Sequence, residues 1–252
     1  MNDEASDGYE AAWAAVATVN GWMTREQGAW LYRAAGQCPD AGRIVEIGSF
    51  QGRSTIVLAL GASPTCEVVA IDPHAGNDRG PRELDGFDAE ASEDHRRFLA
   101  NLAAAGVADR VRHVRRPSTQ AHDEVTGAVD VLYVDGAHRF SPARRDLAEW
   151  GARVVPGGTM LVHDAFSSVG VTLAILATMA PSGRWRYVGR TRSLVRFDAD
   201  LAPGWSSRLV DLVRVLAQMP WFARNLIVKV ALTLGWGRVM RRLGREAPPW
   251  PF

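Results

Sequence analysis

Lysine, cysteine and long apolar runs are scarce in this sequence. The 252 residues contain one lysine, Lys229, and two cysteines, Cys38 and Cys66. Two cysteines cannot build a disulfide framework, which fits a reducing compartment. The longest apolar stretch, residues 226–236, is interrupted by Lys229 and is too short to span a bilayer. Acids near the start replace the basic segment of a secretory signal, so we expect a cytoplasmic protein, with the inner membrane face as an alternative site.

A strong overall charge is lacking as well. The chain carries 29 basic and 28 acidic residues, for a formal net charge of +1. This balance excludes nucleic-acid binding driven by overall charge, and we expect no nucleic-acid partner. Hydrophobic residues make up 47% of the chain, which is enough for one sizeable α/β core.

Apolar segments alternate with helix-like segments along the middle of the chain. We expect strands at residues 43–47, 67–71, 111–114, 129–134 and 159–162, an antiparallel pair at 184–188 and 193–197, and helices at 9–19, 24–35, 54–60, 93–105, 141–153 and 168–179. Strands separated by helices indicate βαβ units and a parallel sheet with helices on both faces. The sequence therefore predicts an α/β fold with a doubly wound, mostly parallel seven-stranded sheet. We expect an N-terminal helical cap (1–36), a ligand-binding core (37–200) and a helical C-terminal extension (201–252).

Ligands of such folds lie beyond the carboxyl ends of the strands, and two of these ends suit a nucleoside. After the first strand, Glu46 precedes Gly48, and Gly48 and Gly52 lie four residues apart. The glycines allow a close backbone approach to a ligand, and Ser49, Ser54 and Thr55 offer hydroxyl groups. The G-x-G-x-x-G dinucleotide pattern is absent, and an acid here suits an amino-bearing ligand better than a phosphate.

The second strand ends at Asp72, whose carboxylate can accept both hydroxyls of a ribose. A glycine-rich turn followed by a surface acid is the alternative interpretation.

The fourth and fifth strand ends carry carboxylates and histidines. Asp135 ends one strand and Asp164 the other, so neighbouring strands would bring them roughly 5 Å apart. Two carboxylates this close favour a hard divalent cation, with His163 as a third ligand or a supporting group. His138 follows Asp135 across a glycine turn and could act as a general base. A turn residue at 138 and a buried structural histidine at 163 remain the alternatives.

Four motifs in order, at residues 46–54, 71–74, 134–138 and 156–164, together resemble class I S-adenosylmethionine (SAM) methyltransferases. Over residues 20–200 they look like the branch that contains macrolide-sugar O-methyltransferases. The resemblance implies a Rossmann-like methyltransferase fold, SAM as cofactor, Mg²⁺ or another divalent cation, and a hydroxyl acceptor. A sugar, such as a mannose-type oligo- or polysaccharide, is the acceptor it implies, and a phenol or other small natural product is the alternative.

The resemblance also implies roles for single residues. Glu46, Gly48, Ser54 and Asp72 would bind SAM, with Asp72 on the ribose and Ser118 on the adenine side. Asp135 and Asp164 match the magnesium carboxylates, and His138 matches the catalytic base. Sugar-modifying relatives often have a carboxylate where this chain has His163, and a histidine lowers the negative charge of the metal site.

A polar loop and a basic tail complete the sequence. Residues 76–94 contain seven acids in a long loop that is either a lid over the site or a solvated surface loop. Residues 205–252 contain eight Lys or Arg and two acids among apolar residues at helical spacing. Such amphipathic helices could pack on the core, form a homodimer or lie on an anionic membrane surface.

Two other functional classes stay open at this point. A nicotinamide-dependent enzyme would share the doubly wound fold, although the missing dinucleotide pattern disfavours it. A non-catalytic or membrane-peripheral module could also keep a SAM-binding fold.

Overall fold

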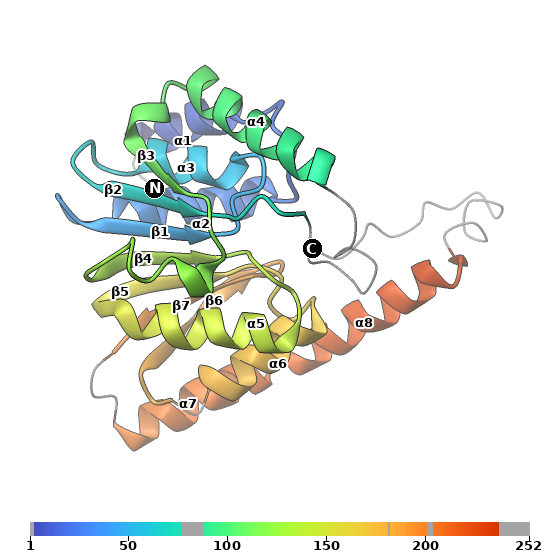
Figure 1. The fold of residues 1–252 in the computed structure, drawn as a ribbon. Helices are drawn as coiled ribbons and strands as arrows, with labels where there is room; N and C mark the ends of the chain where they lie inside the picture. The colour runs from blue at the N-terminus through green and yellow to red at the C-terminus, as the bar shows by residue number, and fades with distance from the viewer. Residues whose placement is uncertain (1–2, 77–87, 181, 201–203, 237–252) are drawn as a thin grey trace.

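The computed structural model describes residues 3–76, 88–180, 182–200 and 204–236 as eight α-helices around one sheet (Figure 1). The helices are α1 (Asp3–Ala15), α2 (Arg25–Gly36), α3 (Arg53–Gly61), α4 (Asp88–Ala104), α5 (Phe140–Arg145), α6 (Val169–Thr178), α7 (Trp205–Leu216) and α8 (Met219–Thr233). The strands are β1 (Arg43–Ile47), β2 (Glu67–Ile71), β3 (Val111–Val114), β4 (Val129–Val134), β5 (Val154–Val162), β6 (Trp185–Thr191) and β7 (Leu194–Ala199).

The seven strands form one sheet in the order β3-β2-β1-β4-β5-β7-β6. The pairs among β1 to β5 are parallel, and β7 runs antiparallel between β5 and β6. This confirms the predicted doubly wound, mostly parallel sheet. The strand order reverses between β1 and β4, and ligands of such sheets bind at that switch point.

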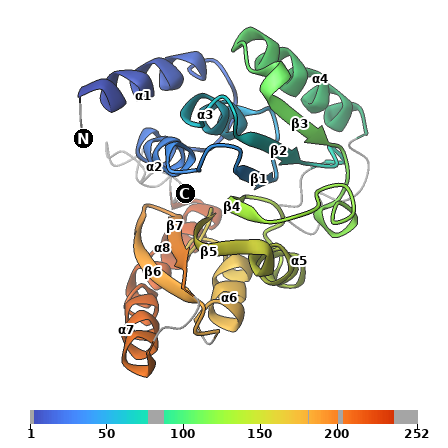
Figure 2. The same cartoon turned by 90° about the vertical axis from the view of Figure 1, so that its left-hand side faces the viewer.

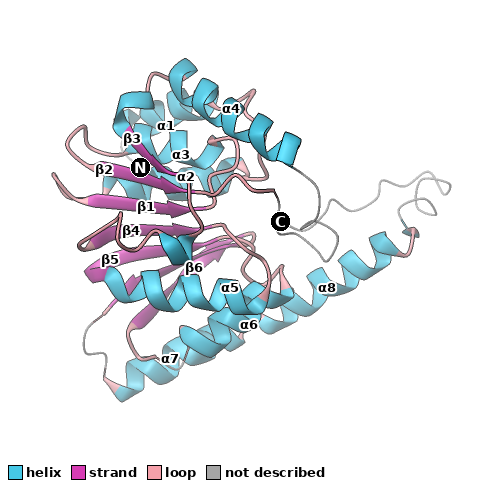
Figure 3. Ribbon diagram, viewed as in Figure 1, coloured by secondary structure: helices cyan, strands magenta, loops and turns pink. Residues whose placement is uncertain are grey.

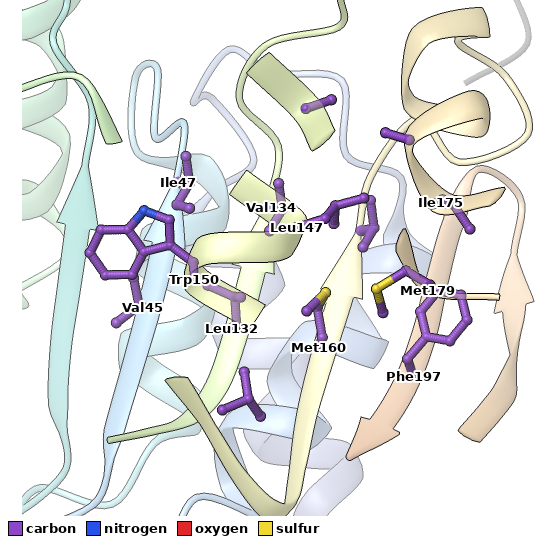
Figure 4. Packing of buried hydrophobic residues seen from close by; sticks show 14 of the residues in the cluster. Val45, Ile47, Leu132, Val134, Leu147, Trp150, Met160, Ile175, Met179 and Phe197 are labelled. Carbon is purple, nitrogen blue, oxygen red and sulfur yellow. The ribbon is translucent and has the colours of Figure 1, made fainter. Parts of the chain in front are cut away.

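Helices cover both faces of the sheet (Figures 2 and 3). The position of a residue along its strand decides which set of helices its side chain contacts. Side chains alternate between the faces along each strand. On β1, Ile44 packs in the cluster under α1 to α4, whereas Val45 and Ile47 pack in the cluster under α5 and α6. Figure 4 shows the cluster under α5 and α6, where Trp150 and Leu147 lie against Val45, Leu132 and Val134 of the strands. Two apolar layers therefore fix the sheet between two sets of helices.

Several local signals act as the sequence indicates. Thr24 caps α2: its hydroxyl accepts from the backbone N–H of Gln27, and the Gln27 side chain accepts from the N–H of Thr24. This reciprocal pair satisfies two of the free N–H groups at the helix start. The antiparallel pair β6–β7 also forms close to its expected position.

Other boundaries differ from the prediction for identifiable reasons. Helix α1 ends at Ala15, and the apolar Val16 and Val19 that suggested a longer helix enter the core from a turn. Strand β5 begins at Val154, five residues before its predicted start at residue 159. The strand can include Pro156 because this residue lies at a register shift of the β4–β5 ladder. A proline is tolerated in a sheet at such an irregularity, since no ladder hydrogen bond needs its missing N–H.

The ends of the expected domains are partly outside the described residues. The expected lid lies mostly at 77–87, outside the described residues, and α4 begins directly after that gap. The tail contains α7 and α8 as far as residue 236. Within the described residues no helix is both long and apolar enough to cross a bilayer.

Candidate functional site

A cavity of about 490 Å³ opens at the carboxyl ends of β1, β2 and β4. The strand order reverses at this place, so several loops meet around one space. Seven residues predicted for the site line the cavity: Gly48, Ser49, Ser54, Asp72, Ser118, Asp135 and His138. The other three predicted residues, Glu46, His163 and Asp164, lie outside its lining.

Gly48 joins the two halves of the site. Its φ of 87° lies in the left-handed region, and a Cβ here would overlap the carbonyl oxygen of Asp135. Only glycine fits this approach, because any side chain would push the loop after β1 away from the loop after β4. The β1–β4 pairing continues into this contact, where the N–H of Asp135 donates to the carbonyl of Ile47 at 2.8 Å. The loop after β1 and the carboxylate of Asp135 thus share one wall.

Asp72 holds the loop after β1 in place. One carboxylate oxygen accepts from the backbone N–H groups of Ser49 and Phe50, each at 2.8 Å, and the other accepts from His74 N–H at 2.7 Å. A carboxylate oxygen has more than one acceptor position, so the side chain can still accept from a ligand in the cavity. The residue expected to bind the ribose therefore also fixes the loop.

Glu46 does not reach the cavity, in contrast to the sequence prediction of a ligand contact. Glu46 faces the same side of the sheet as Ile44, where α3 covers it, and its side chain is fully buried. The hydroxyls of Ser54 and Thr55 donate to its two carboxylate oxygens. Burial raises the pKa of Glu46 from its ordinary value of 4.5 to about 8, against the lowering effect of these hydrogen bonds. Its role in this structure is to anchor the start of α3 beneath the site.

The predicted serines occupy three different places in the wall. Ser49 is buried, and its hydroxyl has no hydrogen-bond partner among the described residues. The hydroxyl of Ser54 donates to Glu46, as described above. The hydroxyl of Ser118 donates to Asp146 at 2.5 Å. Of the three, Ser49 therefore offers an unused hydroxyl to a ligand.

Asp135, His138 and Asp164 form a cluster suited to a cation. One ligand atom from each lies within 4.8 Å of the others, as expected from the neighbouring strands β4 and β5. Nε2 of His138 lies 2.8 Å from a carboxylate oxygen of Asp164. The hydroxyl of Tyr133 donates to Asp135 at 2.9 Å and orients that carboxylate. Two carboxylates and an imidazole fit a divalent ion, and Asp135 and His138 also face the cavity.

His163, expected as a third ligand or a supporting group, lies beside the two carboxylates of the cluster. It is buried, with Nδ1 at 3.1 Å from Asp135 and 3.7 Å from Asp164. Burial alone would lower its pKa, but the two carboxylates raise it from 6.5 to about 10. The pKa of Asp164 is held well below its usual range, because His163 and His138 outweigh its burial. Without a bound cation, the two carboxylates therefore favour the protonated form of His163.

Sequence analysis missed two parts of the wall. Asp146, the first residue of the π-helical segment Asp146–Trp150 that continues α5, is buried at the cavity, and burial raises its pKa from 3.8 to about 6. The segment before α2 contributes Trp22 and Met23, and Trp22 packs on Phe50 with ring centroids 5.2 Å apart. Asp146 lay within a predicted helix, and Trp22 lay in an expected loop. The hydrogen bond from Ser118 to Asp146 is long-range, so no local pattern indicated it.

Comparisons with known proteins agree with this geometry. Residues 45–165 match a family model described as a methyltransferase domain. The fold is a Rossmann-like methyltransferase fold, as in the similar solved structures. A crystal structure of an O-methyltransferase from Bacillus cereus in complex with SAH is similar at a TM-score of 0.53 and 18% identity, over 80% of this chain and 92% of that one. A cofactor-bound protein from MTB has a TM-score of 0.54 and 22% identity, over 79% of this chain and 90% of that one.

A curated relative is similar in sequence over part of its length. The catechol O-methyltransferase of Mycobacterium tuberculosis is 31% identical over 143 residues, which are 56% of this chain and 56% of the relative. The chain thus spans little more than half the length of the curated relative that it matches.

Proposed function

We propose that this protein transfers a methyl group from SAM to a hydroxyl group, with the help of a divalent cation. The proposal rests on one observation: Asp72 and the loop after β1 line the same cavity as Asp135 and His138. A cofactor site and a cation cluster would then border the same space. The methyltransferase fold and the matching core at residues 45–165 support SAM as the cofactor.

Different residues around the cavity would bind SAM and take part in the reaction. The Asp72 carboxylate and the unused Ser49 hydroxyl would hold the ribose and the methionine part of SAM, and Ser118 the adenine side. SAM supplies an electrophilic methyl group when it is bound. The loop after β1, which Asp72 holds in place, would position the methyl group. Positioning contributes much of the rate in such transfers.

The cluster of Asp135, His138 and Asp164 would hold the cation and take the proton. Asp135 and Asp164 supply the negative charge, and a bound cation would lower the pKa of an acceptor hydroxyl. We assign His138 as the general base, because it faces the cavity and Asp164 lies at its Nε2. In this role the imidazole would take the proton of the acceptor hydroxyl as its oxygen attacks the methyl group.

Two acceptor classes follow from different observations. The resemblance of the four motifs to sugar O-methyltransferases supports a sugar hydroxyl, including one on a mannose-type saccharide. The similar catechol O-methyltransferase, and the packed pair of Trp22 and Phe50 beside the cavity, support a phenolic hydroxyl instead.

The test is a panel of sugars and phenols incubated with SAM, in Mg²⁺ and in excess chelator. We expect methylated product from one class in Mg²⁺ and a sharp loss of product in chelator, with SAM binding retained. Full turnover in chelator would remove the cation from the proposal, and calorimetry without SAM binding to the folded protein would remove the methyl transfer.

A further inference from the structure

The outward faces of α7 and α8 carry an unusual amount of exposed apolar surface. Ten large apolar side chains of these helices and the following turn are 40% to 80% exposed: Trp205, Leu209, Val210, Val213, Leu216, Leu226, Ile227, Val230, Leu234 and Trp236. We call this set the α7–α8 outer face. Monomeric soluble proteins rarely leave such a continuous set of large apolar side chains in water.

The inward sides of both helices combine apolar and polar contacts: Val215 is buried in the core, and Met219, Trp221 and Phe222 pack against it. The residues that α7 and α8 turn inward include Asp211, 6% exposed, and Asn225, fully buried. Asp211 pairs with Arg186 at 2.8 Å, and Asn225 donates to the carbonyl of Phe166 at 3.0 Å. Since these inward contacts already anchor both helices, the apolar residues left on the outside indicate that the outer face meets something other than water.

The charges beside the outer face are of one sign. Asp211 is the only acid between residues 204 and 236, and it is buried. Arg214 and Arg224 are exposed, and the sequence beyond residue 236 adds four arginines and one glutamate. An apolar face flanked by arginines complements a surface that is apolar below and negatively charged above.

We infer that the α7–α8 outer face docks this protein on an anionic phospholipid surface. A second copy paired about a two-fold axis would bring the same arginines toward one another, which disfavours a dimer through this face. Trp205 and Trp236 lie at the two ends of the face, and tryptophan prefers the headgroup region of a bilayer. Since no described helix can span a bilayer, the contact is peripheral.

Docking would act close to the reaction site. The inner side of α8 holds the loop after β5, where Lys229 donates to the carbonyl of Ser167 at 2.9 Å and Asn225 to that of Phe166. This loop directly follows Asp164. Figure 1 shows α8 extending past the edge of the sheet at which the strands end. The inference does not depend on methyl transfer, because lipid binding can be measured without turnover.

The experiment is co-sedimentation of the full chain with vesicles of phosphatidylcholine alone and of phosphatidylcholine mixed with phosphatidylglycerol. The face variant carries Leu209→Ser, Val213→Ser, Ile227→Ser and Val230→Ser. The control variant carries Leu99→Ser and Val188→Ser, which remove equally exposed apolar side chains (48% and 51%) on other surfaces. Thermal unfolding checks that both variants keep their fold.

We expect the wild type and the control to bind only the anionic vesicles, and the face variant to bind on the order of a hundredfold more weakly. Added salt and Arg224→Gln should each weaken binding, since arginine attraction is screened by ions. Three results would overturn the inference: equal binding to neutral vesicles, no binding with a dimer that the face variant abolishes, or equal loss in the control variant.

Discussion

Asp72 shows how one carboxylate can serve both a fold and a ligand. It accepts three backbone N–H groups from the loops after β1 and β2, and it lines the cavity. Such a residue cannot be removed without loosening the loop that presents Ser49. Binding and loop order are therefore coupled at this position.

Asp72→Ala should weaken SAM binding by about 1–3 kcal/mol, because acceptors for the ligand and for the loop are lost together. Calorimetry with SAM measures the change. Asp123→Ala, which removes an exposed carboxylate away from the cavity, is the matched control and should bind as the wild type does. Unchanged affinity in Asp72→Ala would place the cofactor elsewhere.

His138 lies where either of two roles is available to it. As a base it would face an acceptor in the cavity, and as a ligand it would complete the cluster with Asp135 and Asp164. His138→Ala should lower kcat by roughly 10²–10⁴ with SAM affinity retained.

Metal titration of the same variant separates the two roles of His138. An affinity for Mn²⁺ equal to that of the wild type supports the base, whereas a lost affinity with a lost rate makes His138 a ligand. Near-normal kcat would show that another residue takes the proton.

The position of the Glu46 side chain shows what a sequence motif does not predict. The motif around Gly48 is recognisable in the sequence. The motif alone does not say on which face of the sheet the Glu46 side chain lies. Alternation along β1 turns Glu46 under α3, among Ser54 and Thr55, rather than toward the ligand. The buried acid therefore affects stability as well as shape.

Glu46→Gln should make the stability of the protein less dependent on pH. The folded pKa of Glu46 is raised to about 8 from 4.5, so the folded state binds more protons than the unfolded state between these values. Its contribution is favourable below about 4.5 and is lost as pH rises toward about 8. The slope is at most about 1.4 kcal/mol per pH unit. Denaturant unfolding of both proteins across this range measures it, and parallel curves would contradict the assignment.

At the scale of elements, the pairing of β4 with β5 builds the cation cluster. Val134 lies opposite Val162, and His163 N–H donates to the carbonyl of Val134 at 2.9 Å, so the residues that follow must emerge side by side. The sequence predicted this meeting because both strands are short apolar runs that end in an acid. It left open whether His163 would be a third ligand, a supporting group or a buried structural histidine, since that depends on packing around the ring.

The Tyr133 hydroxyl should matter because it orients Asp135 from within β4. It is fully buried and donates to that carboxylate at 2.9 Å. Tyr133→Phe should lower cation affinity by roughly 10–100-fold while SAM still binds. Mn²⁺ titration of this variant tests it, with Tyr187→Phe on β6 as the control for removing a buried tyrosine hydroxyl. Equal cation affinity in both variants would leave Tyr133 with a packing role alone.

At the scale of the whole molecule, the sequence predicted the core better than the ends. Alternating apolar strands and helices determine the sheet, since each must bury one face. The segment at Trp22 and the acid Asp146 reach the cavity only through the tertiary fold. The exposed apolar face of α7 and α8 likewise depends on how these helices pack. These features depend on contacts between residues far apart in the sequence, which periodicity does not contain.

A cavity walled by loops from β1, β2 and β4 should couple ligand binding to the stability of the whole domain. A ligand that binds only the folded state at a hundredfold excess over its Kd stabilises it by about 2.7 kcal/mol. In a protein of this size each kcal/mol raises Tm by about 2–4 °C, so SAM or S-adenosylhomocysteine should raise it by about 5–10 °C. Scanning fluorimetry measures the shift, which should shrink in Asp72→Ala. NAD should give none, because the loop after β1 lacks the dinucleotide glycine pattern. A Tm raised by NAD and not by SAM would instead identify a nicotinamide enzyme on the same sheet.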